Sequence, residues 1–417
     1  MTIAAIGTIA TRVAVAAINL LMAAVAARML GLEGVGRMSL LVLAITFVML
    51  LCNVTAGGLV YLEPRHGTRT LRWLSYGWAL LACAAGALLA EPAGLAPAGL
   101  GLHVGAIAFL ESIATTHAAL LLGRQRFGAH NVFTALRPVL LLAVFSLLLH
   151  RDGPEFNDFL VALYAAHGVT ALLSGMLVAR LPAHRTDAAA AWVAMLRQGL
   201  PAQAANGMQL LNYRLSYFLV QRFHGASALG LWSITTQLAE SAWLAPKSLG
   251  SVLYARVSNT EQADRQRELT LSVMKASVSL ALVAALLLLA LPESLFQWVF
   301  GPEAEGITGL VLLLSPGLVA MAASQAFSHF FSGVGRVHHN TIASGIALVA
   351  TVALGLWLIP TEAQRGAAIA SSVAYAVAIL YQAILFNRRT GARFVDYLPD
   401  RRDGQRVKRL WRWVTAR

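Results

Sequence analysis

Long apolar segments separated by short polar ones run the whole length of the chain. Runs of roughly 20 apolar residues, the length that crosses a bilayer as a helix, recur about twelve times. They begin near Ile3, Ser39, Leu74, Leu100, Val132, Phe159, Val193, Ala228, Leu271, Ile307, Thr341 and Ala367. Of the 417 residues, 58% are hydrophobic and 12% are charged, a balance outside the range of soluble globular proteins. The pattern predicts an all-α, polytopic membrane protein.

The short polar segments alternate between basic and acidic. Basic segments follow the second, fourth, sixth, eighth, tenth and last spans, and carry Arg65, Arg69, Arg72, Arg124, Arg126, Arg180, Arg185, Arg256, Arg265, Arg267 and Arg336. The segments between them carry Glu91, Asp152, Glu155, Asp158, Glu293, Glu303, Glu305 and Glu362. This alternation follows the positive-inside rule and predicts an even number of spans with both termini in the cytoplasm. The net charge of +13 is thereby explained by topology, and no nucleic-acid partner is expected.

The second half of the chain repeats the first. Five residues of the first half are found again 194 positions later. They are Arg28, Gly31, Gly36, Ser39 and Leu59, and their counterparts in the same order are Arg222, Gly225, Gly230, Ser233 and Leu253. Because each half holds an even number of spans, both enter the membrane from the same side. Such parallel repeats commonly form two lobes around a central cavity and work by alternating access.

This repeat predicts four parts of the chain. Residues 1–182 and 193–388 are the two six-helix lobes, and residues 183–192 are a cytoplasmic linker. The basic tail at 389–417 mixes arginine and lysine with tryptophan, a composition typical of an amphipathic helix on anionic membrane lipids. A solvated, frayed terminus is the alternative for this tail.

Polar residues form a stripe on each of the two spans that open the second half. At 100° per residue, one face of the seventh span holds Gln203, Gly207, Arg214, Tyr217 and Gln221, with Asn206 and Tyr213 at its edge, and the eighth holds Ser233, Gln237, Glu240 and Lys247. An ionisable side chain at bilayer depth costs a few kcal/mol or more, so it faces a protein interior or a wet cavity. Two interpretations stay open: a buried structural pair of Arg214 with Glu240, or a cationic lining for an anionic solute.

Three other polar residues fall inside spans of the first half. Arg12 and Asn19 share a face of the first span, and Arg12 is either an anchor that reaches the headgroups or a cation that lines a cavity. Glu111 lies near the middle of the fourth span. It is a candidate coupling site for a proton or sodium gradient, and an internal acid hydrogen-bonded to serine or threonine is the alternative.

The residues that open each half carry a resemblance to a known family. The segments ARMLGLEGVGRMSLL and NYRLSYFLVQRFHGASALGLWSITTQLAE, the latter followed by LGSVLYARVS, are similar to those of the polysaccharide-transport (Wzx-like) flippases of the multidrug/oligosaccharidyl-lipid/polysaccharide (MOP) exporter superfamily. The resemblance implies a MATE-like fold of two six-helix lobes. It also implies a flippase in the bacterial inner membrane, coupled to an ion gradient. Its cargo would be an undecaprenyl-diphosphate-linked oligosaccharide for O-antigen, capsule or exopolysaccharide synthesis, and its partners a polysaccharide polymerase and other assembly proteins.

The resemblance also bears on single residues. Arg12 and Arg214 match positions where the family often has cavity cations, while Ser216 stands where it frequently has an acid. Two further C-terminal spans, found in the peptidoglycan-precursor flippases of the superfamily, are not expected here. A surface-polysaccharide exporter is therefore favoured over a lipid II flippase.

The sequence thus predicts a cavity for an anionic, sugar-bearing lipid. Its lining is predicted to consist of Arg12, Asn19, Gln203, Asn206, Arg214, Gln237, Glu240 and Lys247. Tyr213, Tyr217 and Trp232 are candidates for stacking on sugar rings, and anchors at the membrane interface are the alternative for these aromatic residues. An ion-coupled small-molecule or drug antiporter is the first alternative, although it would favour an acidic cavity.

An enzyme, specifically a membrane polysaccharide polymerase, is the second alternative. The known families of such polymerases carry a large periplasmic loop with catalytic residues. In this chain the corresponding loop, at 151–158, is short. No nucleophile, base and acid occur in a catalytic pattern. Cys52 and Cys83 lie in spans without a CxxC motif, so neither a metal nor a disulfide framework is indicated. No catalytic residue and no cofactor are expected.

Overall fold

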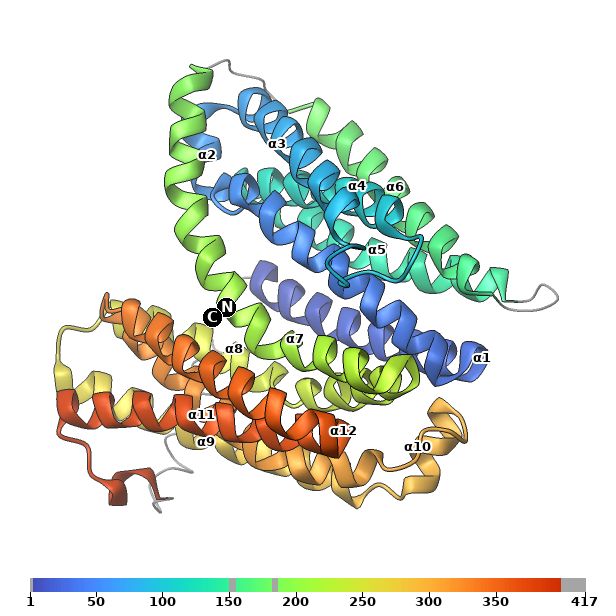
Figure 1. Ribbon diagram of the computed structural model, residues 1–417. Coiled ribbons are helices and arrows are strands. Elements are labelled where there is room, and N and C mark those ends of the chain that lie inside the picture. Colours follow the sequence, from blue (N-terminus) through green and yellow to red (C-terminus); the bar gives the residue numbers. More distant parts are fainter. Residues whose placement is uncertain (1–2, 150–154, 182–186, 399–417) are drawn as a thin grey trace. The chain divides into compact units, whose positions relative to one another are not determined.

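A computed structural model describes residues 3–149, 155–181 and 187–398 (Figure 1). Over these ranges the chain is α-helical apart from turns, short connections and one 3-10 turn. It divides into two compact units, one from Ile3 to Gly207 and one that begins at Met208. The division falls inside α7 (Ala188–Ser241), so the first turns of that helix pack with the N-terminal unit. Most of the predicted tail, 389–417, and part of the predicted linker lie outside the described residues.

The first unit is a bundle around α4. Its helices are α1 (Ile3–Ala56), α2 (Leu59–His66), α3 (Thr68–Leu89), α4 (Gly101–Gly123), α5 (Phe127–Leu148) and α6 (Phe156–Ala179). α4 packs against α1, α3 and α6, and α5 packs against α1 and α6. At one end of the bundle, Leu59, Leu71, Leu120 and Met195 are fully buried in one apolar cluster. Met195 belongs to α7, and this contact holds the first turns of α7 against the unit.

The second unit is a bundle around α11. Besides the rest of α7 it contains α8 (Leu244–Ser258), α9 (Ala263–Ala290), α10 (Glu293–Phe300), α11 (Ile307–Gly333), α12 (His338–Thr390) and the 3-10 turn η1 (Phe394–Tyr397). α11 packs against α8, α9 and α12. Phe327, Phe330, Phe331 and Phe386 form the centre of its core, with ring centroids of neighbouring pairs 4.9 to 5.3 Å apart.

Three helices of more than fifty residues each bend at a single residue. α1 bends at Gly31 (φ 67°, ψ −179°), α7 at Gly225 (φ 80°, ψ −172°) and α12 at Ala363 (φ 48°, ψ −127°). The first two conformations are essentially restricted to glycine, because a Cβ atom would clash with the backbone. Each bent helix therefore supplies two of the predicted spans, and glycines 31 and 225 occupy equivalent places in the two halves.

The helices identify a multi-pass membrane protein. Among the described residues, seven helices are long and apolar enough to cross a bilayer, and two of these, Ala10–Glu63 and His338–Thr390, are 54 and 53 residues long. All twelve predicted segments coincide with a helix or with half of a bent one. The short helices α2 and α10 were not predicted from the sequence. The fold is all-α and polytopic, as the hydropathy pattern predicts.

The turn between α4 and α5 recurs between α11 and α12. Arg126 N donates to Leu121 O at 2.8 Å, and 210 positions later Arg336 N donates to Phe331 O at 2.7 Å. The residue before each arginine, Gln125 or Gly335, has a positive φ of 58° or 73°. These two turns have the same backbone hydrogen bonds although their sequences differ.

A side-chain hydrogen bond beyond each turn is also found at equivalent positions in the two halves. His130 Nδ1 donates to Ala118 O at 3.1 Å, and Asn340 Nδ2 donates to Ser328 O at 2.9 Å, again 210 positions later. The spacing between the halves grows from 194 to 210 because α9 is longer than α3, α11 is longer than α4, and the connection between α9 and α11, which contains α10, is longer than the connection between α3 and α4. The internal repeat predicted from five residues is thus present in the structure.

Basic segments gather at one end of each unit. In the first unit, Arg124 from the α4–α5 turn forms an ion pair with Glu63 of α2, and the hydroxyl of Thr68 at the start of α3 donates to the same carboxylate at 2.7 Å. In the second, Arg267 of α9 forms an ion pair with Asp396 after α12. These contacts bring alternate connections together, as the charge pattern requires. The assignment of this end to the cytoplasm stays a prediction.

Candidate functional site

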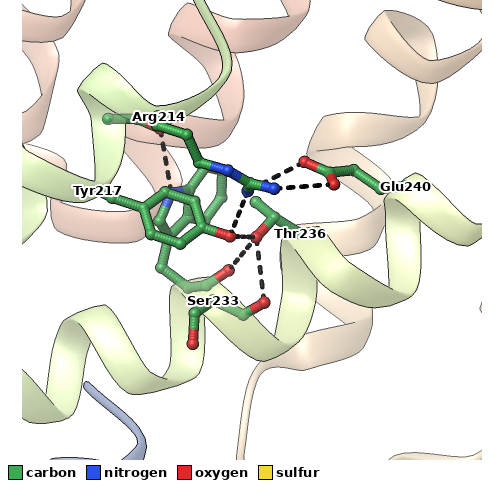
Figure 2. A network of polar contacts seen from close by, with 7 residues as sticks. Arg214, Tyr217, Ser233, Thr236 and Glu240 are labelled. Atoms are coloured by element: carbon green, nitrogen blue, oxygen red, sulfur yellow. Dashed lines mark hydrogen bonds and ion pairs between the residues drawn. The ribbon is translucent and has the colours of Figure 1, made fainter. Parts of the chain in front are cut away.

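The candidate site is built around an arginine–glutamate pair within α7. Arg214 Nη1 lies 3.1 Å from Glu240 Oε1, and Nη2 lies 3.1 Å from Oε2 (Figure 2). In a straight helix, 26 residues would separate these positions by about 39 Å along the axis. The contact exists because the bend at Gly225 returns the second limb of α7 alongside the first.

A second set of contacts holds the guanidinium from its other side. Arg214 Nη1 donates to Tyr217 Oη at 2.7 Å, and the Tyr217 hydroxyl is hydrogen-bonded to the hydroxyl of Thr236 (Figure 2). The Thr236 hydroxyl donates to the main-chain carbonyls of Trp232 and Ser233 at 2.9 and 3.1 Å. Tyr217 must therefore donate to Thr236, which leaves its oxygen free to accept from Arg214. The orientation of Arg214 is fixed by this network.

Aromatic rings lie next to the ion pair. Tyr213, Trp243 and Tyr375 surround one another, with centroid separations of 5.8, 5.9 and 6.0 Å. Trp243 Nε1 donates to Leu318 O at 3.3 Å, and Lys247 Nζ lies 5.8 Å from the centre of the Trp243 ring. α8, α11 and α12 thus all contribute to the surroundings of the pair. Tyr375 was not predicted as a site residue.

The pair is neither fully buried nor free. The side chain of Arg214 is 28% exposed and that of Glu240 is 31% exposed. Of the two open interpretations of the sequence, the pairing of Arg214 with Glu240 is present, and the cationic lining for an anionic solute stays a prediction. A bidentate arginine–carboxylate contact is geometrically specific, and a ligand that approaches Arg214 has to compete with Glu240.

The expectation of aromatic stacking on sugars needs correction for two of its three residues. Tyr217 is 6% exposed and Trp232 is 0% exposed, so a sugar ring cannot reach either of them in this conformation. Trp232 Nε1 donates to Ser216 Oγ at 3.1 Å. The serine that stands where the resembling family often has an acid therefore anchors a core tryptophan. Tyr213 is half-buried and is the one of the three with an accessible part.

Most of the remaining predicted lining residues belong to other parts of the chain. Arg12 and Asn19 are exposed on α1, and Gln203 and Asn206 lie on the part of α7 that packs with the first unit. Asn206 Nδ2 donates to Gln203 Oε1 at 3.3 Å. Gln237 is half-buried on the second limb of α7. A single cavity lined by all eight residues stays a prediction.

Glu111 of α4 belongs to a separate polar cluster in the first unit. It forms an ion pair with Arg137 of α5, and the two side chains are 21% and 39% exposed, respectively. His167 of α6 is 5% exposed, and its Nδ1 has no hydrogen-bond partner among the described residues. Arg137 was missed because it was read as part of the fifth span, although an arginine inside an apolar run is the same signal that identified Arg214. The proposed coupling role of Glu111 stays a prediction.

The two cysteines lie against each other in the first unit. Cys52 of α1 and Cys83 of α3 are both buried, and their sulfur atoms are 3.4 Å apart without a covalent bond. Within the described ranges, no three histidine, cysteine, aspartate or glutamate side chains are grouped closely enough to hold a metal ion.

Comparison with solved structures places this fold among known transporters. Twenty-eight chains match. A lipid II flippase MurJ in an inward closed conformation has a TM-score of 0.73 at 12% identity, over 92% of this chain and 87% of that one. An inward-facing multidrug resistance MATE family transporter of the MOP superfamily has a TM-score of 0.68 at 14% identity, over 94% and 95%. The MATE multidrug transporter DinF-BH, solved in complex with a ligand, has a TM-score of 0.66 at 17% identity, over 94% and 95%.

No family model matches the sequence, and no curated protein does. At 12 to 17% identity, the likeness to solved structures establishes the fold. The chain has the all-α, MATE-like fold that MurJ and the MATE transporters share.

Proposed function

We propose that this membrane protein translocates an undecaprenyl-diphosphate-linked oligosaccharide across the bacterial inner membrane for surface polysaccharide synthesis, and that Arg214 contacts the diphosphate. The observation that carries the proposal is the partly exposed guanidinium of Arg214 on a membrane-spanning helix, oriented by Tyr217 and Glu240. A diphosphate cannot cross hydrocarbon unaided, because burial of its charges without partners is prohibitive. Guanidinium stays charged and binds phosphate oxygens bidentately.

The surroundings of Arg214 fit a cargo that is part anion and part sugar. The charges of Arg214 and Glu240 cancel, and Lys247, which is exposed beside Trp243, leaves the site with a net positive charge. Tyr213 presents its accessible part next to the same pair. Aromatic rings bind the apolar faces of sugars, so the site offers contacts for both parts of a lipid-linked glycan.

The bends in the long helices suit alternating access. Gly31, Gly225 and Ala363 interrupt α1, α7 and α12 at one residue each, and hinges are typically a few residues that absorb a large change in φ and ψ. We further propose that the Glu111–Arg137 pair couples this movement to a proton or sodium gradient, with both termini in the cytoplasm. A polysaccharide polymerase and other assembly proteins are the proposed partners.

The second candidate is an ion-coupled small-molecule antiporter. It is favoured by the fold shared with a MATE multidrug transporter that was solved in complex with a ligand. The site itself favours the flippase, because the charges of Arg214 and Glu240 cancel and the exposed Lys247 beside Trp243 leaves a net positive charge, which disfavours a cationic drug.

The two candidates predict different lipids in a deletion strain. Mass spectrometry of polyprenyl-linked glycans, combined with a sugar-modifying enzyme that cannot cross the membrane, measures both identity and leaflet. For a flippase, a single repeat unit accumulates on the cytoplasmic face, and its mass identifies the cargo. Accumulation on the outer face points to a polymerase, and an unchanged lipid pool supports the antiporter.

The role of Arg214 is tested in the same assay by three variants. Arg214→Ala is expected to abolish export with normal membrane insertion, and Arg214→Lys to retain part of it, because lysine keeps the charge but loses the bidentate geometry. Arg222→Ala is the matched control, since Arg222 is an exposed arginine on the same helix and its loss should leave export intact. Normal export by Arg214→Ala at normal expression would show that Arg214 is not the diphosphate contact.

A further inference from the structure

Basic side chains from two distant segments meet at one end of the second unit. Arg336 lies in the turn between α11 and α12, His338 and His339 open α12, and Arg389 lies in its last turn. The bend in α12 returns its second limb along the first, so that Tyr381 Oη lies 3.4 Å from His339 Nδ1. The start and the end of this long helix are thereby side by side.

We call Arg336, His338, His339 and Arg389 the basic cluster. The two arginines and His338 all act electrostatically on His339, and Arg336 also acts on Arg389. The rings of the two histidines have centroids 4.1 Å apart. Among the residues that the structure describes, no carboxylate forms an ion pair with either arginine. The basic cluster therefore carries positive charge that the described part of the chain does not neutralise.

The helix surface that continues from the basic cluster is apolar and exposed. His338 is exposed and shares a face of α12 with Ile342 and Val349, because their spacing is close to one and three helical turns. The two apolar residues are 45% and 70% exposed, respectively. On a membrane-spanning helix, exposed apolar residues of this kind lie against acyl chains. A lipid whose chains follow this row has its phosphate at the level of the basic cluster.

We propose that the basic cluster binds the phosphate of an anionic phospholipid from the leaflet at this end of the unit. Guanidinium groups bind phosphate oxygens bidentately, and histidine rings add N–H donors. The positive-inside rule explains why arginines lie at a cytoplasmic end, but it does not require that two arginines distant along the chain meet there. A bound phosphate offsets their repulsion. The lipid is a component of the bilayer, so the inference is independent of the proposed cargo and of Arg214.

The test is native mass spectrometry of the purified full chain in detergent, titrated with phosphatidylglycerol or with phosphatidylcholine. Each bound lipid adds its own mass, so the first binding constant is measured separately from the weaker ones. Wild-type protein should bind the first phosphatidylglycerol more tightly than the next, and phosphatidylcholine without such a difference. The double variant Arg336→Gln/Arg389→Gln should weaken the first constant by about 25-fold, or about fivefold for each arginine. Excess inorganic phosphate should leave the lipid bound, because the acyl chains add to its affinity. Displacement by inorganic phosphate would identify a soluble phosphate as the ligand and overturn the inference.

Two further double variants distinguish a site from a general effect of charge. Arg265→Gln/Arg388→Gln removes two other exposed arginines of the same unit, neither of which is among the groups that act on His339, so it should bind as wild type. Arg336→Lys/Arg389→Lys keeps the charge and should lose only part of the affinity, since lysine cannot bind bidentately. Phosphatidylglycerol should also raise the unfolding temperature of wild type, but not that of Arg336→Gln/Arg389→Gln. Wild-type affinity in Arg336→Gln/Arg389→Gln, or an equal loss in both glutamine variants, would overturn the inference.

Discussion

The backbone at Gly225 allows a prediction whose size follows from geometry alone. Gly225 has φ 80° and ψ −172°, and an added Cβ there meets no atom within 4 Å. A Gly225→Ala substitution therefore creates no side-chain clash, and its cost is backbone strain of about 1–3 kcal/mol. Alanine recovers about 0.4–1 kcal/mol because it restricts the unfolded chain more than glycine does. The expected net loss is about 1–2 kcal/mol.

The matched control is a glycine in ordinary helix. Gly345 lies within α12, and a Cβ there also meets open space. Gly345→Ala should gain about 0.5–1 kcal/mol, so the two substitutions should move stability in opposite directions. The free energy of unfolding is measured in detergent by circular dichroism as denaturant is added. If Gly225→Ala is as stable as wild type, the bend at residue 225 does not have the conformation described, and the reversal that brings Glu240 to Arg214 has another origin.

Three further predictions concern charged residues outside the Arg214 site. Arg124→Met removes the cationic partner of Glu63, which is 1% exposed and keeps only the hydrogen bond from Thr68. The free energy of unfolding should fall by about 1–3 kcal/mol, and adding Glu63→Gln should restore part of it. The Glu293 carboxylate accepts hydrogen bonds from the Ile307 and Thr308 amides at 3.0 and 3.1 Å. Burial acts to raise the pKa of this carboxyl, but the hydrogen bonds outweigh burial and hold the pKa below its ordinary value. Its stabilisation of the start of α11 is thus complete above about pH 4.3 and is lost as pH falls through the lowered pKa, so Glu293→Gln should flatten the acid side of a thermal-stability profile. In proteoliposomes, Glu111→Gln should abolish gradient-driven transport but preserve exchange at equilibrium, and gradient-driven transport by this variant would exclude Glu111 as the coupling acid.

Arg214 and Glu240 show how far the sequence leads toward a site. Their residue types and depth in apolar segments identify both as intramembrane charges, because bilayer energetics allow few such residues without a function or a partner. Helical periodicity places each on a polar face. Periodicity has no information on which residue of one helix meets which residue of another, so the pairing itself was one of two open interpretations.

Glu111 and Trp232 mark the limits of the same reasoning. The partner of Glu111 is Arg137, 26 residues away on the next helix, and that contact depends on how α4 and α5 pack. Trp232 was a candidate for stacking on sugar because it is aromatic, yet it is fully buried and its Nε1 donates a hydrogen bond to Ser216. Local pattern gives a face of a helix, whereas the packing of neighbouring helices decides whether that face is open.

The sequence by itself determined the all-α membrane fold, the number of spans and the repeat around Gly31 and Gly225, because hydrophobic length and glycine-dependent bends are local properties of the chain. Only the tertiary structure decided that Glu240 contacts both terminal nitrogens of Arg214 while Tyr217 holds the guanidinium in place. That arrangement depends on the return of one helical limb along another. Its contacts join residues that are close in space and distant along the helix axis, which no periodicity in the sequence specifies.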